Sequence, residues 1–226
     1  YNNLGVVLRS LSFPEAAIIC YQKCLSLRPE SMGLYSNIGN AHRDLGNYKL
    51  SVKYHNKSIK IAPKNPEAYF NLGLALRDLG KLQQSLDAFS KTLHLNPNHD
   101  KCKWDQALTL LTMGDYKNGF DQYESRWNLE KMPMRQFSRP QWAGEDISGK
   151  KLLVYQEQGF GDMIQFARFI PMVKKICTEV YIEVQPELHS LFLSLEGADK
   201  IFSKGSEFPN FDFCIPMMSL FKCLKL

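Results

Sequence analysis

Two stretches of the chain, SNIGNAHRDLGNY (Ser36 to Tyr48) and FNLGLALRDLGKL (Phe70 to Leu82), are near copies set 34 residues apart. The same period returns in four columns of identical residues: Gly5, Gly39, Gly73; Asn3, Asn37, Asn71; Arg9, Arg43, Arg77; and Pro29, Pro63, Pro97. A fixed period of this length is typical of stacked helical repeats, in which each unit buries its apolar face against the next. Because such stacks present a concave surface, the first half of the chain is predicted to be a binding platform.

Each repeat is predicted to form two antiparallel helices. In the clearest repeat, Pro66 suits the first position of a helix that runs to about Leu79, and Gly80 suits its end. The second helix follows and stops before Pro97. Gly73, on the first helix, is small enough to let the two helices approach closely.

This pattern resembles the tetratricopeptide repeat (TPR). The aromatic, leucine, glycine, small and proline positions of that family fall on Tyr69, Leu72, Gly73, Ser85, Phe89, Thr92 and Pro97. The preceding repeat matches at Ile38, Gly39, Ser51, Ser58 and Pro63, although His55 replaces an aromatic residue. The first repeat begins at the aromatic position with Tyr1, and the fourth departs from the pattern at Ala107 and Arg126-Trp127. The resemblance implies an all-α TPR superhelix of about four helix pairs, at residues 1–31, 32–65, 66–99 and 100–133.

Two of the columns are candidates for a peptide-binding groove. In related superhelices an asparagine ladder such as Asn3, Asn37 and Asn71 faces the concave side, where each amide can donate to and accept from a peptide backbone. The alternative is that these asparagines bond within or between repeats. Arg9, Arg43 and Arg77 are candidates for the same groove, or else they pair with neighbouring helices. A clamp for C-terminal carboxylates is disfavoured, because Asp44 and Asp78 stand where that clamp needs lysine.

Composition and charge exclude several classes of protein. The formal net charge is +5, and its densest basic run, Lys49 to Lys64, is predicted to form a solvated outer face without the interleaved aromatics that stack nucleic-acid bases. No apolar run is long enough to span a bilayer, and no signal peptide opens the sequence. The six cysteines lack metal-site spacing, so we expect free thiols in a reducing cytoplasm, no metal and no nucleic-acid partner.

After Trp127 the period is lost. Residues 134–150 read as a connector that Phe137 and Trp142 pin onto folded parts. Strands are then predicted at 151–156, 179–185, 200–203 and 211–215, with a helix from about Asp162 to Ile176 and a short one from Pro186. This alternation predicts a partial doubly wound α/β domain over residues 151–226, with a ligand at the carboxyl ends of its strands.

The string WAGEDISGKKLLVYQEQGFGDMIQFARFIP (Trp142 to Pro171) resembles the start of a glycosyltransferase domain related to the lipopolysaccharide heptosyltransferases. The matching positions are Trp142, Gly144, Gly149, Lys150, Gln158, Gly159, Gly161, Asp162, Gln165, Phe166 and Arg168. The resemblance implies a Rossmann-like half of the GT-B fold, and a full-length parent that transfers a sugar from a nucleotide-sugar donor to an acceptor. The alternative is a non-catalytic TPR scaffold that binds peptide segments in its groove.

In that family an aspartate in the place of Asp162 takes the proton of the acceptor hydroxyl, so Asp162 is the candidate base and the N-cap of its helix is the competing role. Gly159, Gly161, Glu157 and Gln165 are candidate substrate-binding residues around the same loop. A dinucleotide site that uses Glu183 for the ribose is a weaker alternative.

A GT-B enzyme needs a second α/β half for its donor, and the sequence starts in mid-repeat without methionine. We therefore expect a piece of a longer protein that binds no cofactor and transfers no sugar by itself.

Overall fold

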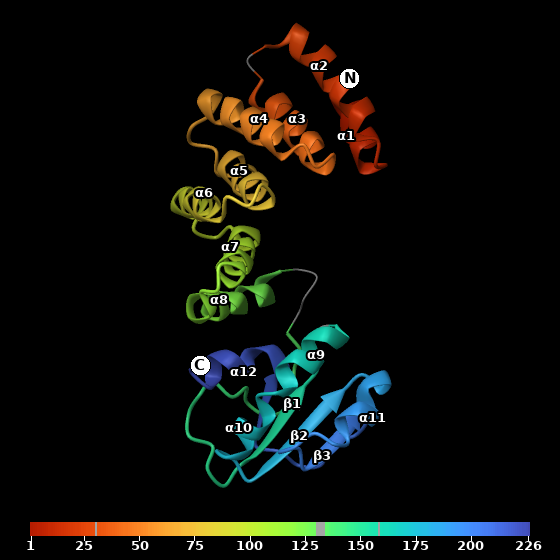
Figure 1. Ribbon diagram of the computed structural model, residues 1–226, viewed down its shortest axis with the longest axis vertical. Helices are drawn as coiled ribbons and strands as arrows, with labels where there is room; N and C mark the ends of the chain where they lie inside the picture. The colour runs from red at the N-terminus through yellow and green to blue at the C-terminus, as the bar shows by residue number, and fades with distance from the viewer. Residues whose placement is uncertain (30, 130–133, 158) are drawn as a thin grey trace. The chain divides into compact units, whose positions relative to one another are not determined.

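The computed structural model describes residues 1–29, 31–129, 134–157 and 159–226 (Figure 1). The chain divides into two compact units, Tyr1–Met132 and Pro133–Leu226, and each is described here by itself. Gln158 of the glycosyltransferase resemblance lies outside the described residues, as do the last positions of the fourth repeat, 130–133.

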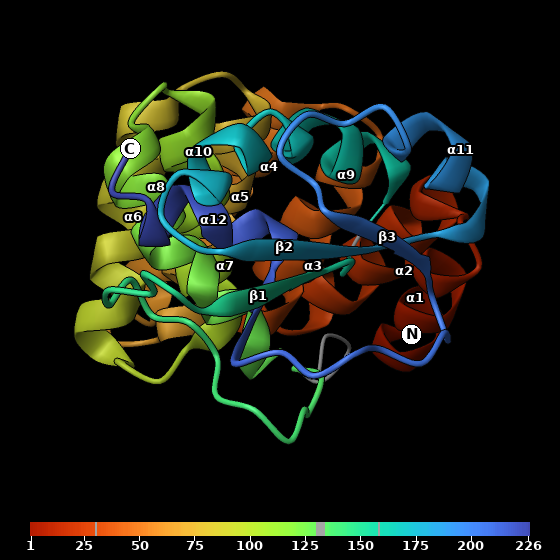
Figure 2. The ribbon, with the colours of Figure 1, turned by 90° about the horizontal axis from the view of Figure 1, so that it is seen from below.

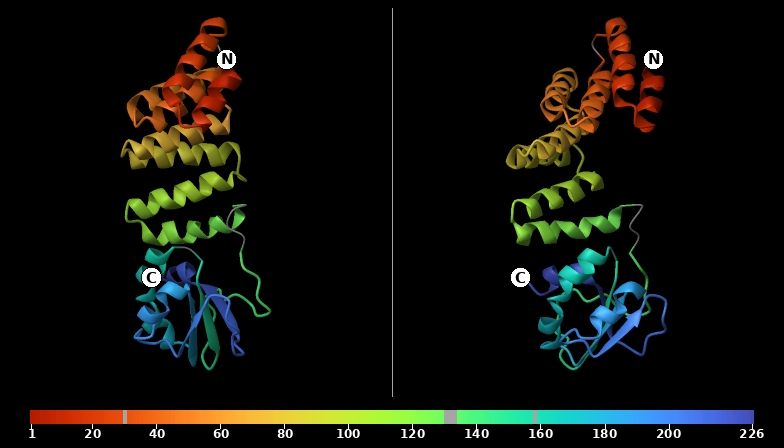
Figure 3. Two further views of the ribbon diagram at one scale, coloured as in Figure 1. Left: turned by 90° about the vertical axis from the view of Figure 1, so that its right-hand side faces the viewer. Right: turned by 45° about the vertical axis from the view of Figure 1, so that its right-hand side comes forward.

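The first unit is a stack of helix pairs, which Figure 3 shows as successive layers. Each second helix packs against the first helix of the next repeat, and the first helices of neighbouring repeats also contact one another. The first helices therefore form the inner row of the stack. The pairs are α1 (Asn2–Ser10) with α2 (Pro14–Leu27), α3 (Met32–Asp44) with α4 (Tyr48–Ile61), α5 (Pro66–Asp78) with α6 (Leu82–Leu95), and α7 (Asp100–Thr112) with α8 (Tyr116–Tyr123).

A glycine on the first helix and a ring on the second helix set the spacing of the first three pairs. A Cβ atom added to Gly73 would lie 2.5 Å from the ring of Phe89, and one added to Gly39 would lie 2.7 Å from the ring of His55. These distances are too short for any side chain, so the ring occupies the space that the glycine leaves. Ser85 completes the contact, because its hydroxyl donates to the carbonyl oxygen of Gly73 at 2.7 Å.

In the fourth repeat, the glycine that lets the two helices approach lies on the second helix instead of the first. Ala107 replaces the glycine and is fully buried, while Gly119 on α8 is the residue whose added Cβ would lie 2.6 Å from the side chain of Leu111. The second helix then tightens into a 3-10 turn at Glu124–Asn128, where the fully buried Arg126 guanidinium lies 4.1 Å from the centre of the Trp127 ring. The departures from the repeat pattern in the sequence thus correspond to different helix packing in the last repeat.

The second unit contains a parallel sheet with strand order β3-β2-β1-β4. The predicted strands are found within one or two residues of their expected ends, at β1 (Lys151–Tyr155), β2 (Glu179–Val184), β3 (Lys200–Ser203) and β4 (Phe213–Pro216). The helices of this unit are α9 (Phe160–Ala167), α10 (Ile170–Lys174), α11 (His189–Phe192) and α12 (Leu220–Cys223). The chain places β2 and then β3 on one side of β1, and it places β4 on the other side. The point between β1 and β4 where the direction changes marks the ligand-binding edge of such sheets.

The two faces of the sheet are covered differently. Figure 2 shows α9, α10 and α11 on one side of the strands and the green segment that precedes β1 on the other. That segment belongs to the second unit: Phe137 packs 4.9 Å from Tyr155, between ring centres, and the N–H of the buried Trp142 donates to the Cys214 carbonyl oxygen at 2.8 Å. The connector is therefore held to the sheet by Phe137 and Trp142, as expected.

The prediction of one continuous helix from Asp162 to Ile176 is wrong. The helix starts at Phe160, ends at Ala167 and resumes as α10, because Pro171 has no N–H and its ring crowds the preceding turn. Ile164 is 49% exposed, and the buried residue of that turn is Met163.

The predictions for the lysine run and the cysteines can be compared with the described residues. All five lysines of the run from Lys49 to Lys64 are exposed, and all six cysteines are free thiols. Among the described residues, no helix is long and apolar enough to cross a bilayer, and no cluster of metal-ligating side chains is present.

His55 is the unusual core residue of the stack. It occupies the ring position that Tyr21 and Phe89 fill in the adjacent repeats, and it is fully buried. Neither ring nitrogen has a hydrogen-bond partner among the described residues. Burial, reinforced by the positive charges of Arg43 and Arg9, lowers the pKa of His55 from 6.5 to about 4. The imidazole is therefore neutral at neutral pH and resists protonation.

We predict that His55→Phe stabilises the first unit and weakens its sensitivity to acid. An unpaired buried imidazole costs about 1–3 kcal/mol, which the apolar ring avoids. Since the folded pKa lies below the unfolded value, the unfolded state binds more protons between pH 6.5 and about 4. The wild type should lose roughly 3 kcal/mol across that window as the pH falls. Melting temperatures at several pH values check this.

His42, whose pKa is also lowered by burial, should leave a smaller acid sensitivity in the Phe variant. If the melting temperatures of wild type and variant fell by the same amount from pH 7 to pH 4, His55 would not control the acid response.

Candidate peptide-binding face and the carboxyl edge of the sheet

The asparagine column lies on the inner row of helices. Asn37 on α3 donates from Nδ2 to Oδ1 of Asn2 on α1 at 3.1 Å, which ties the first two repeats together. Asn71 on α5 donates from Nδ2 to the carbonyl oxygen of Glu67, one turn earlier on the same helix, at 2.8 Å. Asn3 is exposed, and its side chain makes no hydrogen bond to the described residues. Bonding within and between repeats, the alternative reading of the column, is therefore observed for Asn37 and Asn71.

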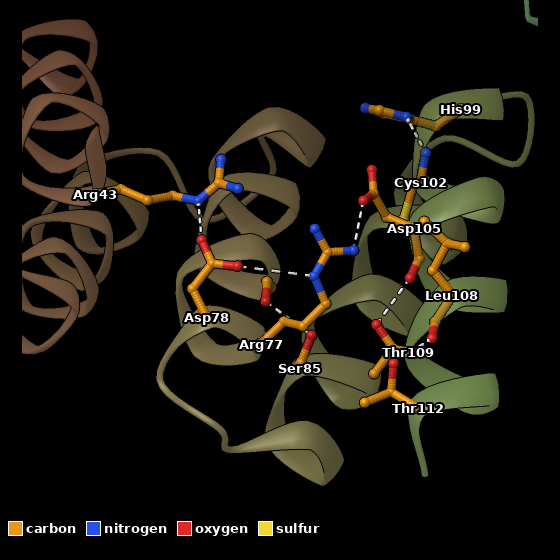
Figure 4. Close-up of polar contacts among 11 residues, drawn as sticks. Arg43, Arg77, Asp78, Ser85, His99, Cys102, Asp105, Leu108, Thr109 and Thr112 are labelled. Carbon is orange, nitrogen blue, oxygen red and sulfur yellow. Dashed lines mark hydrogen bonds and ion pairs between the residues drawn. The ribbon is translucent and has the colours of Figure 1, made fainter. Parts of the chain in front are cut away.

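The arginine column forms a ladder of ion pairs between successive repeats. Arg9 Nε lies 2.6 Å from Asp44, and Arg43 Nε lies 2.5 Å from Asp78 (Figure 4 shows the second pair). Each arginine therefore reaches the aspartate that follows the equivalent arginine of the next repeat. The positive charge of the column is neutralised inside the stack, so it is not available as a free anion site.

The ladder changes register at the fourth repeat. Thr112 stands where the next aspartate would be, so Arg77 turns to Asp105, at 2.6 Å from Nη1, and lies 3.9 Å from Asp78 (Figure 4). Asp105 occupies the next place of the asparagine column. At this end of the inner face the two columns therefore merge into one ion-paired group.

The second candidate site is the carboxyl edge of the sheet, where the loops after β1 and β4 meet. The Met218 N–H donates to Glu157 Oε1 at 3.0 Å, which joins the two loops at the point where the strand order reverses. Beside it, Gln185 Nε2 after β2 donates to Gln156 Oε1 after β1 at 3.0 Å. Polar side chains that follow β1 and β2, and a backbone N–H that follows β4, thus lie along this edge.

The other predicted residues of this edge belong to the loop and the first turns of α9. Gly159 is the N-cap, and Asp162 lies three residues further on and makes no capping bond. The N-cap role considered for Asp162 is therefore wrong, because the loop after β1 starts the helix earlier. Asp162 is partly exposed and has no hydrogen-bond partner among the described residues, while Gly161 and Gln165 are exposed.

Glu183 does not serve a dinucleotide. It is fully buried on β2 and forms an ion pair with Arg135 of the segment before β1. Arg135 in turn lies over the Phe137 ring, 4.8 Å from its centre. The ribose-binding alternative is thus wrong for this residue. No sequence pattern predicts the pair, because 48 residues separate its members and Arg135 belongs to no repeated column.

We predict that the ion pairs of the ladder stabilise the stack most where their side chains are least exposed to solvent. The Arg77 and Asp105 side chains are 22% and 17% exposed, and the Arg9 and Asp44 side chains are 36% and 37% exposed. A double-mutant cycle with Arg77→Gln and Asp105→Asn should give a coupling energy near 1 kcal/mol, and the matched cycle with Arg9→Gln and Asp44→Asn about 0.3 kcal/mol. Urea unfolding at low and high salt measures both, and salt should reduce both. Zero coupling at Arg77 would contradict the role of the ladder.

Comparisons with known proteins agree with the repeat geometry. Sequence models of the tetratricopeptide repeat match residues 1–31 and 66–99, and a model described as a TPR repeat matches residues 39–80. A stretch of 51 residues is 41% identical to protein FlbA of Caulobacter vibrioides, and this stretch covers 22% of the chain and 9% of FlbA.

Solved structures of MamA share the fold of the repeats. MamA from Desulfovibrio magneticus RS-1 superposes with a TM-score of 0.53 at 23% identity, over 59% of this chain and 76% of that chain. A second MamA crystal structure gives a TM-score of 0.52 at 22% identity, over 59% and 78% of the two chains. The first unit is therefore a stack of tetratricopeptide repeats.

Proposed function

We propose that the first unit binds an extended segment of a partner protein along its inner face, and that Asn37 and Asn71 bind the peptide backbone. The observation that carries this proposal is that each amide is fixed by one bond to the protein and still has unused capacity. A side-chain amide has two N–H donors and an oxygen that accepts twice. Each asparagine therefore retains one donor and its acceptor, in an orientation set before the ligand arrives.

Pre-orientation favours binding because less side-chain freedom is lost on association. Asn37 is held by Asn2 of the preceding repeat, and Asn71 by the backbone of its own helix. Asn3 is exposed and unbonded among the described residues, so we assign it a weaker contact at the start of the same column.

The arginines support this face by fixing its spacing. Arg9, Arg43 and Arg77 each bind an aspartate of the next repeat, so they hold neighbouring first helices at a constant separation. That separation sets the distance from one asparagine to the next. In this proposal the arginines lie beside the peptide and order the groove, and the asparagines make the backbone contacts.

We predict that the double variant Asn37→Ala with Asn71→Ala weakens peptide binding about tenfold or more, since at least two hydrogen bonds of about 0.5–1.5 kcal/mol each are lost. The probe is an array of random-sequence peptides, followed by titration of the peptides that the wild type captures. Asn56→Ala, at an exposed asparagine of α4, is the matched control and should bind as the wild type does. Unchanged affinity in the double variant with an intact helical spectrum would refute the proposal.

A second function is proposed for the second unit: it is the acceptor half of a glycosyltransferase whose donor, a nucleotide sugar, binds elsewhere in the full-length parent. The observation that favours it is the state of Asp162, whose carboxylate is partly exposed near the carboxyl edge and is not used as a helix cap. A free carboxylate at that edge can accept the proton of an acceptor hydroxyl while the sugar is transferred to its oxygen. Glu157 and Gln165, with the open backbone at Gly159 and Gly161, would then bind the acceptor.

We predict that Asp162→Asn and Asp162→Ala lower sugar transfer by the full-length parent equally, by roughly 10² to 10⁴. Because Asp162 makes no capping bond, both variants should also unfold within about 0.5 kcal/mol of the wild type. Transfer rates and urea unfolding test the two parts. Normal turnover of Asp162→Asn, or a clear loss of stability in Asp162→Ala alone, would refute the assignment.

A further inference from the structure

A small pocket opens at the junction between the first and second repeats. Its volume is about 160 Å³. Taking about 30 Å³ for each water molecule, it has room for roughly five, which matches the five non-hydrogen atoms of a glutamate side chain. The walls come from α1, from the end of α2 and from the start of α3, and the residues used below are Asn2, Arg28, Ser31, Gly33 and Asn37.

Three positions of the repeat carry smaller side chains at this junction than at the junction of the third and fourth repeats. Gly33 takes the place of Glu67 and Lys101 in the following repeats, and a Cβ atom added to Gly33 would meet nothing within 4 Å. Asn2 and Ser31 take the places of Phe70 and His99. The space at the first junction is therefore a property of these particular residues.

The same positions are filled at the junction of the third and fourth repeats. The rings of Phe70 and His99 lie 4.6 Å apart, centre to centre, and His99 Nε2 lies 2.9 Å from Glu67 Oε1. The rings of Phe70 and His99 thus occupy the positions that correspond to Asn2 and Ser31 of the pocket.

The polar groups around the pocket suit an anion. Arg28, at the end of α2, forms no ion pair or hydrogen bond through its guanidinium with any described residue. Asn2 and Asn37 retain N–H donors besides the one that joins them, and the described residues that line the pocket include no carboxylate. An unpaired guanidinium beside amide donors favours a carboxylate over a neutral or cationic group.

The start of α3 strengthens this preference. The Ser31 side chain makes no capping bond, and the first turn of α3 contains no acidic residue. By contrast, α5 begins with a capping Asn65 and with Glu67 in its first turn. The pocket therefore adds uncapped helix N–H groups to the donors of its side chains, and these also favour negative charge.

We propose that this pocket binds the carboxylate of an aspartate or glutamate side chain in the peptide that lies along the asparagine column. This inference rests on the proposed peptide-binding function and extends it from backbone recognition to a sequence preference. Asn2 and Asn37 link the two, because Asn37 belongs to the column and also lines the pocket. The protein thus recognises the peptide backbone along the asparagine column and one acidic side chain at the junction of the first and second repeats.

The test compares peptides captured by the wild type with versions in which each acid is replaced in turn by its amide, Asp by Asn and Glu by Gln. One replacement should weaken binding to the wild type about tenfold, the typical loss for a charge-assisted hydrogen bond. Arg28→Gln should bind both versions with equal, weakened affinity. Gly33→Gln should do the same by filling the pocket, and it should fold normally because the added side chain meets open space in a helix.

Lys64→Gln is the matched control, since Lys64 is an exposed cation in the loop after the next second helix. It should retain the full preference for the acid. An equal loss of preference in Lys64→Gln would mean that overall charge acts rather than the pocket, and this would overturn the inference. Captured peptides that bind equally well as acids and amides would overturn it while leaving the proposed backbone recognition intact. Failure of the wild type to capture any peptide would overturn both.

Discussion

The close contact between a glycine on the first helix and a ring on the second is the constraint on which the first three helix pairs depend. Gly39 and Gly73 allow His55 and Phe89 to approach at distances that no side chain would permit. The two helices of a repeat are thereby held at one separation. Because the contact recurs with the sequence period in the first three repeats, their first helices meet in one register, which changes at the fourth repeat.

That register turns columns in the sequence into surfaces. It brings Arg43 opposite Asp78 and Asn37 opposite Asn2, so one column becomes an ion-pair ladder and the other an ordered row of amides. Deviations from the repeat have local consequences. Thr112 forces Arg77 onto Asp105, and Gly33 opens a pocket at the first junction. In the proposed function, the regular positions line the peptide-binding face, and the irregular ones give it a preference for an acidic side chain at one end.

Much of the fold could be predicted because its signals are local and repeated. Helix pairs follow from apolar spacing with Gly80 and Pro97 as stops, and the strands of the second unit follow from short apolar runs. The helix after β1 was misjudged because its start depends on the loop geometry at Gly159 and its interruption on Pro171.

The candidate sites were predicted less completely than the fold. The asparagine and arginine columns were visible in the sequence, but their partners lie in neighbouring repeats and required the three-dimensional register. The pair between Arg135 and Glu183 has no repeated pattern, so nothing in the sequence marks it. The pocket at the first junction is made by missing side chains, and Gly33 was not singled out because a missing side chain carries no motif.

In the proposed function, a partner peptide lies on the inner row of helices and contacts the amides of Asn37 and Asn71. The most direct measurement is nuclear magnetic resonance of the asparagine side-chain N–H groups during titration with a captured peptide. We predict that the Asn37 and Asn71 signals shift in proportion to saturation, while the signal of Asn56 on α4 stays in place. Shifts confined to residues of the second helices, with Asn37 and Asn71 unmoved at saturation, would contradict it.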